Sequence, residues 1–220
     1  MRHSGGVDLS DAVRRRRMVR TYDPDRPVDP AAVGRLLDAA TRAPSAGFTQ
    51  GWDFVVLSRD VDRERFWTST SDPGSTGDRW LWGMRTAPVL VVCLADPDAY
   101  LDRYAEPDKG WTDRRAARWP IPYWDVDTGM AALLMLLTAV EEGLGACFFG
   151  VPAGRHDAVR EAFGIPPGRR LVGVVSLGHP APDRRSPRLR RGRRGVAEVA
   201  HDGRFGVPWR PDRTAAPPTR

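Results

Sequence analysis

The chain has 220 residues, of which 41% are hydrophobic, and its 34 Lys+Arg against 28 Asp+Glu give a formal net charge of +6. This length suits one ordinary domain, and the apolar content excludes a chain that is disordered throughout. The apolar run from Met130 to Val140 is shorter than the roughly 20 residues that a membrane span requires. The N-terminus lacks the apolar stretch of a secretory signal, and Cys93 and Cys147 lie in apolar surroundings. We therefore expect a cytoplasmic protein with two buried thiols.

Two helices are predicted near the N-terminus. The first is capped by Asp8 and delivers the arginines at 14–17 at its C-terminal end. The second begins at Asp29, continues with Pro30 at its first position, and ends before Pro44. Its apolar residues form a single stripe that consists of Val33, Leu36, Leu37 and Ala40.

The next hundred residues predict strands separated by irregular segments. A polar loop over 45–51, which we expect to be flexible, leads into a strand at 52–57. A second, fully buried strand is predicted at 88–94 because the run is continuously apolar. Between these strands, the Ser-, Thr- and Gly-rich stretch 68–77 must interrupt any helix that starts near Arg63. The polar but aromatic segment from Ala99 to Tyr123 suits a lid or a partner surface better than a core.

A helix over 127–142 is apolar on nearly every face and ends at Gly143. Such a helix must be buried all round, which a small domain achieves most easily against a second copy, so we expect a homodimer. A strand over 146–150, a helix over 153–163 and a core strand over 171–177 follow.

After Gly178 the chain becomes rich in arginine and proline. We expect one domain over 1–183 and an arm over 184–220 that lies on another surface, because this composition cannot form its own core. Guanidinium groups from the arm and from 14–17 could converge on one phosphate, whose oxygens match their planar fork. Alone, these arginines would equally suit a solvated helix face or an arm that binds nucleic acid. A basic nucleic-acid-binding protein is therefore the alternative from another functional class.

Four stretches carry motifs in a characteristic order. They are Arg16-Arg17-Met18-Val19-Arg20, Ala43-Pro44-Ser45-Ala46-Gly47-Phe48-Thr49-Gln50-Gly51-Trp52, Gly143-Leu144-Gly145 with Gly150, and the late arginine group. Together they resemble the nitroreductase family of FMN-dependent oxidoreductases. The resemblance implies an α+β fold in which helices flank a central, mainly antiparallel sheet. It also implies an intertwined homodimer with an extended C-terminal arm.

The resemblance further implies an FMN cofactor that is reduced by NADH or NADPH. Electrons would pass in pairs, by hydride transfer, to flat electron-poor acceptors such as nitroaromatics, quinones, flavins or a specialised metabolite. One open flavin face would serve donor and acceptor in turn, which gives ping-pong kinetics. No catalytic side chain is required, since the flavin supplies the chemistry. The aromatic segments 67–82 and 111–123 are predicted to set the acceptor range by stacking.

Site residues follow from the same resemblance. The motifs that hold the FMN phosphate and ribityl chain correspond to Arg16, Arg17, Met18, Arg20, Arg191 and Arg193. The loop that lines the flavin from the partner subunit corresponds to Pro44, Ser45, Ala46, Gly47 and Gln50. The backbone that lies beside the isoalloxazine, where a main-chain N–H reaches the central-ring nitrogen, corresponds to Phe149 and Gly150.

Two positions depart from the family pattern. Met18 stands where a hydroxyl residue is usual, which removes one hydrogen bond that could reach the flavin or its phosphate, and Gly51 stands where proline is usual. The loop from Ser45 to Gln50 is also similar to that of the related flavin-fragmenting enzyme that makes dimethylbenzimidazole, although Met18 differs from the aspartate found there. That chemistry and the use of a deazaflavin stay open as alternatives.

No metal site is expected. The four histidines, His3, His156, His179 and His201, lack metal-ligand spacing, and the two cysteines form no CxxC motif.

Overall fold

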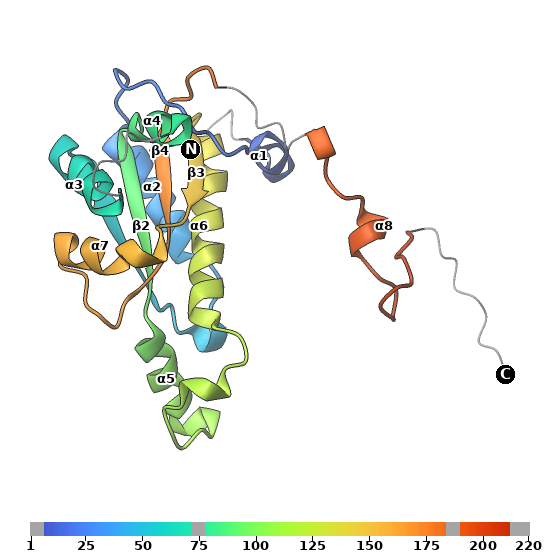
Figure 1. Cartoon of the computed structure of the whole chain (residues 1–220). Coiled ribbons are helices and arrows are strands. Elements are labelled where there is room, and N and C mark those ends of the chain that lie inside the picture. The colour runs from blue at the N-terminus through green and yellow to red at the C-terminus, as the bar shows by residue number, and fades with distance from the viewer. Residues whose placement is uncertain (1–6, 72–77, 184–189, 212–220) are drawn as a thin grey trace, which may run out of the picture. The chain divides into compact units, whose positions relative to one another are not determined.

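The computed structural model describes residues 7–71, 78–183 and 190–211. The chain divides into two compact units, Met1–Asp183 and Arg184–Arg220. The larger unit contains a four-stranded sheet with helices on both faces (Figure 1). Each unit is described by itself below.

All neighbouring strands of the sheet are antiparallel, in the order β1-β2-β4-β3. The strands are β1 (Trp52–Leu57), β2 (Val89–Ala95), β3 (Gly145–Phe149) and β4 (Arg170–Gly178). Their bounds lie within about a residue of the predicted ones, and β2 is buried along its whole length, as its apolar sequence predicts. The predicted α+β class with an antiparallel sheet is confirmed.

The two faces of the sheet carry separate cores, because successive side chains of a strand point in opposite directions. On one face, Val89, Val91 and Cys93 pack with α2 (Pro30–Thr41) and α6 (Tyr123–Glu141). On the other face, Leu90, Val92 and Leu94 pack with residues of the helices α3 (Asp60–Thr70), α4 (Arg79–Arg85) and α7 (His156–Phe163). The free thiols of Cys93 and Cys147 lie one in each core, which confirms that both are buried.

The helix starts follow the predicted capping residues. The Asp8 carboxylate accepts a hydrogen bond from the Ser10 N–H ahead of α1 (Leu9–Arg15), and Asp29 does the same for Ala31 ahead of α2. Helix α3 begins at Asp60, earlier than predicted, and α4 was not predicted. Short 3-10 turns occupy Ala46–Phe48, Pro107–Lys109, Ala116–Arg118 and Ala153–Arg155.

Helix α6 begins at Tyr123 rather than Asp127, because Pro122 supplies the residue that precedes the first turn. Its inner face is buried against the sheet and α2 through Ala131, Ala132, Met135, Leu136 and Ala139. By length and hydropathy alone this helix passes the test for a membrane span, as the core helices of globular proteins also do. Its packing makes it the central helix of one core, and within the larger unit its outer face stays partly exposed at Val126 and Leu133.

The segment expected to form a lid or a partner surface contains regular structure. It contains α5 (Pro97–Ala105), and the Tyr100 side chain is fully buried. Neighbouring aromatic rings pack edge to face, with centroids 4.6 Å apart for Tyr104 and Trp119 and 5.4 Å apart for Trp111 and Trp119. We call residues 97–124 the aromatic module. Aromatic residues far apart in the sequence contact one another here, which periodicity does not reveal, and a role of the module as a lid or partner surface stays a prediction.

The smaller unit contains α8 (Val196–Val199) and a turn closed by an antiparallel bridge between His201 and Pro208. None of its described residues, 190–211, is buried. Large apolar side chains, among them Phe205 and Val196, are exposed there. This unit lacks a core of its own in the part that the structure describes.

Candidate functional site

The arginine motif lies along the edge strand β3. Met18 forms a parallel bridge with Ala146, and the Val19 N–H donates to the Ala146 carbonyl at 3.0 Å. The Phe148 N–H points to the Met18 sulfur at 3.5 Å. Residues 16–20 therefore extend the sheet beyond β3 and join the motif to the strand that ends at Phe149.

Side chains of this extended segment alternate between two sides. Arg16, Met18 and Arg20 share one side of this segment, which the bridge between Met18 and Ala146 holds beside β3. Burial raises the pKa of the Cys147 thiol on β3, and the positive charges of Arg20 and Arg16 oppose that rise. Arg17 and Arg15 line a separate pocket of about 320 Å³ beside Gly143 and Gly145. Of the predicted phosphate residues, the structure therefore groups Arg16 with Arg20 and sets Arg17 apart.

Among the described residues, the guanidinium groups of Arg16 and Arg20 pair with no carboxylate, and Arg20 donates only to the Met18 carbonyl at 3.3 Å. The Arg16 Nη1 is buried without a hydrogen bond, and within residues 7–71, 78–183 and 190–211 neither Arg16 nor Arg20 makes an ion pair. Other arginines do, for example Arg35 with Glu142 and Arg170 with Asp125. A buried charged donor without a partner is costly, so an anion that contacts Arg16 and Arg20 would satisfy this site.

A buried hydroxyl pair fixes the motif to the sheet. The Tyr22 hydroxyl donates to the Val19 carbonyl at 2.7 Å and lies 2.7 Å from the Ser176 Oγ on β4. Burial raises the pKa of Tyr22, so its hydroxyl keeps the proton that it donates. Tyr22 and Ser176 thus set the position of residues 16–20 relative to the sheet.

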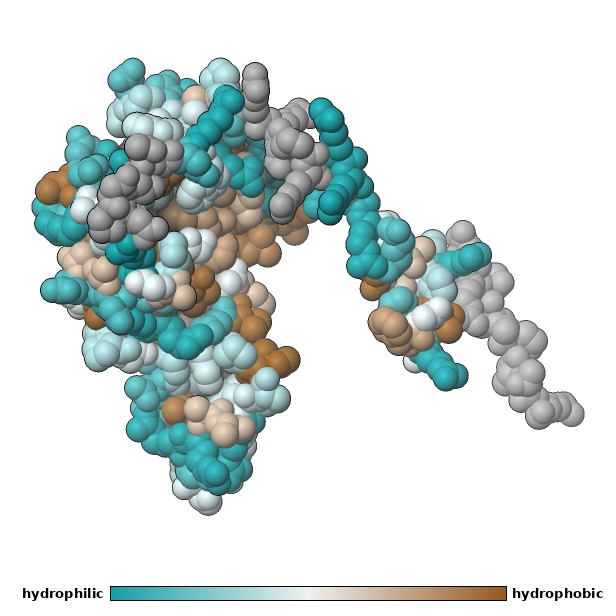
Figure 2. All heavy atoms as spheres, in the orientation of Figure 1, coloured by the Kyte–Doolittle hydropathy of each residue, from teal (hydrophilic) through white to brown (hydrophobic). Residues whose placement is uncertain are grey.

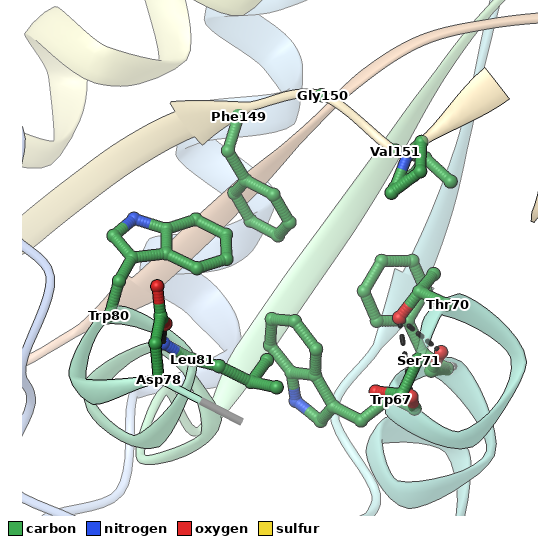
Figure 3. A pocket seen from close by; sticks show the side chains of 11 residues that line it. Trp67, Thr70, Ser71, Asp78, Trp80, Leu81, Phe149, Gly150 and Val151 are labelled. Carbon is green, nitrogen blue, oxygen red and sulfur yellow. Dashed lines mark hydrogen bonds between the residues drawn. The ribbon is translucent and has the colours of Figure 1, made fainter. Parts of the chain in front are cut away.

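A pocket of about 400 Å³ opens beside the end of β3 (Figure 3). Phe149 and Gly150 form one wall, and residues of α3 and α4 form the others, including Trp67, Trp80 and Leu81. The Trp67 ring stacks on Phe149 with centroids 5.8 Å apart and planes 10° from parallel, and Trp80 meets Phe149 edge to face at 5.6 Å. The Trp67 Nε1 is buried without a partner. Aromatic walls of this kind suit a flat ligand.

The predicted flavin loop lies elsewhere on the chain. It precedes β1, whereas the motif borders β3, and these two strands form opposite edges of the sheet, about 14 Å apart at the usual strand spacing. Its contacts include hydrogen bonds from the Ala46 N–H to Asp127 at 2.8 Å and from the Arg103 Nε to the Gly47 carbonyl at 3.0 Å. The Ser45 Oγ accepts from the Gln50 N–H at 2.9 Å. The loop is therefore anchored, in contrast to the flexibility expected from its composition.

One chain thus brings together only part of the predicted site. The group formed at β3 consists of Arg16, Met18, Arg20, Phe149 and Gly150. The loop from Pro44 to Gln50 is not part of that group, and Arg191 and Arg193 are exposed in the smaller unit, where their role stays a prediction. Sequence reasoning missed Asp127, although a carboxylate within an apolar helix is a usable signal.

Comparison with known proteins decides the family. The family model described as Nitroreductase family matches residues 13–179. The chain belongs to the nitroreductase family. It is accordingly an oxidoreductase of that family, as the four motifs predict.

Relatives and solved structures agree with this family. The chain is 31% identical over 167 residues to a protein of Archaeoglobus fulgidus with the provisional name NADH dehydrogenase/NAD(P)H nitroreductase, which covers 75% of this chain and 81% of the relative. It is 30% identical over 195 residues to an NADH dehydrogenase of Thermus thermophilus, with 80% and 88% covered. A provisionally named nitroreductase of Desulfovibrio desulfuricans, crystallised with FMN, shares the fold with a TM-score of 0.67 at 24% identity, with 90% and 98% covered.

Proposed function

We propose that this nitroreductase-family chain is an FMN-dependent NAD(P)H oxidoreductase that acts on flat, electron-poor acceptors. The observation that carries the proposal is the junction of the arginine motif with β3. There, the unpartnered Arg16 and the nearby Arg20 lie next to the strand whose end forms the aromatic pocket. A phosphate-bearing aromatic cofactor requires this combination of a cationic and a flat apolar region.

The residues present fit FMN. Arg16 and Arg20 would hold the phosphate, and the backbone at Phe149 and Gly150 would border the ring system. A Cβ at Gly150 would meet no atom within 4 Å, so this backbone is open to a flat ring. FMN, when bound, supplies hydride transfer between NAD(P)H and an acceptor. The terminal phosphate of FMN suits the arginines, and the chain has no Gly-x-Gly-x-x-Gly loop of the kind that binds a pyrophosphate.

A second copy of the chain would complete the site. The outer face of α6 carries an apolar stripe that recurs in steps of four and three residues and consists of Val126, Met130, Leu133, Leu137 and Val140. Val126 is 41% exposed and Leu133 is 47% exposed, and hydrophobic side chains gather over this helix (Figure 2). Monomeric proteins rarely leave such a stripe uncovered. In the homodimer that we propose, the loop from Pro44 to Gln50 reaches the flavin of the partner subunit.

Donor and acceptor would bind in turn at one open face. Trp67 and Trp80 form aromatic walls of the pocket at Gly150, where nitroaromatics or quinones would stack. Because both substrates need the same place, the reaction divides into two half-reactions with ping-pong kinetics.

The test begins with the cofactor. Purified protein is expected to be yellow and to release FMN on denaturation, rather than FAD or a deazaflavin. Stopped-flow reduction with NADH and NADPH then identifies the reductant, and initial rates over a grid of NAD(P)H and quinone concentrations are expected to give parallel double-reciprocal lines. A colourless protein that binds no added FMN would overturn the proposal, and intersecting lines would exclude the shared face.

A further inference from the structure

Asp127 is a buried carboxylate in an apolar helix. Its residue is 1% exposed, and it lies on α6, which is almost entirely apolar from Met130 onward. The Asp127 Oδ2 accepts hydrogen bonds from the Ala46 N–H at 2.8 Å and from the Tyr100 hydroxyl at 2.7 Å. Burial of a carboxylate is costly unless hydrogen bonds compensate for it. Here, one compensating bond goes to the backbone of the loop that precedes β1.

That loop holds an unusual backbone conformation. Gly47, Phe48 and Gln50 have φ angles of 65°, 55° and 53°, and two of these residues carry side chains that disfavour this left-handed region. Such conformations persist when the surrounding structure imposes them. Asp127 holds the start of this stretch through Ala46, and Arg103 holds it through the Gly47 carbonyl.

Tyr100 packs against Gly51, the residue that follows this loop. It is fully buried, and a Cβ at Gly51 would lie 2.5 Å from its ring. Proline, the usual residue at this position in the family pattern, would therefore collide with Tyr100. Tyr100 links Gly51 to Asp127, because its ring packs on Gly51 and its hydroxyl donates to the Asp127 carboxylate.

We infer that Asp127 is a positioning residue that, with Tyr100, holds the loop from Ser45 to Gln50 in the shape that the flavin site of the partner subunit requires. This inference rests on the proposed function, but the part that concerns the shape of the loop can be tested without the cofactor. The carboxylate does not touch the cofactor; it acts through the Ala46 N–H. Loss of its charge-assisted hydrogen bonds would free the left-handed residues to relax.

The first measurement is amide hydrogen exchange of the full chain without added flavin. Asp127→Ala is expected to accelerate exchange of the amides of residues 46–50 by about tenfold. Asp127→Asn keeps one acceptor oxygen and is expected to restore part of the protection. Thr128→Val is the matched control, because Thr128 is the next residue of α6, is equally buried, and uses its hydroxyl on the Trp124 carbonyl of its own helix. Tyr100→Phe provides a milder variant in case Asp127→Ala does not fold.

The second measurement follows the cofactor in the same variants. We expect FMN dissociation constants about tenfold higher for Asp127→Ala, with a changed visible circular dichroism spectrum of the bound flavin, and wild-type behaviour for Thr128→Val. Unchanged loop exchange in Asp127→Ala and in Tyr100→Phe would overturn the inference. Faster loop exchange with unchanged flavin affinity and spectrum would overturn the link to the cofactor. If the wild-type chain binds no FMN, the proposed function fails, and the exchange data still decide whether Asp127 holds the loop.

Discussion

The motif at 16–20 and the aromatic module at 97–124 are both rich in arginine, yet their arginines differ in what they contact. In the module, Arg114 pairs with Asp98 and Asp102, and Arg103 pairs with Glu106 and Asp108. Beside β3, Arg16 and Arg20 have no carboxylate partner among the described residues, and one nitrogen of Arg16 is buried without any partner. The same residue type therefore forms ion pairs in one region and, among the described residues, forms none at Arg16 and Arg20 in the other.

The aromatic residues of the two regions pack in similar ways. In the module, Tyr104, Trp111 and Trp119 pack on one another. Beside β3, Trp67 and Trp80 pack on Phe149, and these three rings also border a pocket. Residue type does not separate these regions, because arginine and aromatic side chains gather in both. The buried, unpartnered nitrogen of Arg16 and the pocket at Gly150 therefore mark the candidate site.

The largest effect is expected from Leu133→Glu, which places a charge in the exposed stripe of α6. We expect the dimer to dissociate, because a carboxylate buried between two apolar helices has no partner there. If the loop from Ser45 to Gln50 completes the site of the partner, FMN binding is lost with it. Sedimentation measures the first outcome and flavin titration the second.

Arg35→Ala is the control for this experiment, since Arg35 is exposed on α2 outside the stripe. A wild-type chain that sediments as a monomer near 24.4 kDa and still holds flavin would contradict the shared site.

The next effect tests the arginines of the motif that have no carboxylate partner among the described residues. Arg16→Ala and Arg20→Ala are each expected to raise the FMN dissociation constant tenfold or more, since a hydrogen bond to a charged group contributes about 1.5–3 kcal/mol. Arg193→Ala tests the predicted contribution of the smaller unit in the same titration. Arg114→Ala is the matched control from the module, and because exposed ion pairs contribute about 0.2–1 kcal/mol, it should slightly lower stability without changing flavin affinity. Equal affinities in all four variants would remove phosphate binding from these residues.

A smaller effect is expected for the aromatic residues. Trp80→Ala enlarges the pocket at Gly150 and should change the ratio of kcat/KM between a quinone and a nitroaromatic by several-fold, at unchanged FMN content. Trp111→Ala changes a ring that packs within the module and should alter this ratio less. The reverse order would show that the module of one subunit reaches the acceptor site of the other.

Local signals in the sequence were sufficient for most of the fold. Capping aspartates predicted α1 and α2, and short apolar runs, several of them β-branched or aromatic, predicted all four strands, because these features depend on neighbouring residues. The aromatic module was not predictable in this way, since Tyr100 is buried through contacts with Asp127 and Gly51, which are distant in sequence. The order of the motifs suggested Arg16 and Arg20 as phosphate residues. That they lie on the opposite side of the segment from Arg17 follows from the bridge between Met18 and Ala146, which the sequence does not reveal.

The smallest effect concerns the exposed, paired Arg35 on α2 and depends on pH. Arg35 donates to both carboxylate oxygens of Glu142 at 2.6 and 2.7 Å, and these hydrogen bonds and the positive charge lower the pKa of Glu142. A carboxyl group with a lowered pKa stabilises the folded chain above its ordinary pKa, and this contribution disappears as the pH falls through the lowered value. The free energy of unfolding of Arg35→Ala should therefore lie slightly below that of the wild type near neutral pH and approach it in acid. Arg16→Ala, measured without flavin, removes no ion pair and should show no such pH-dependent loss. An equal deficit of Arg35→Ala at every pH would show that Arg35 stabilises α2 by packing rather than by its charge.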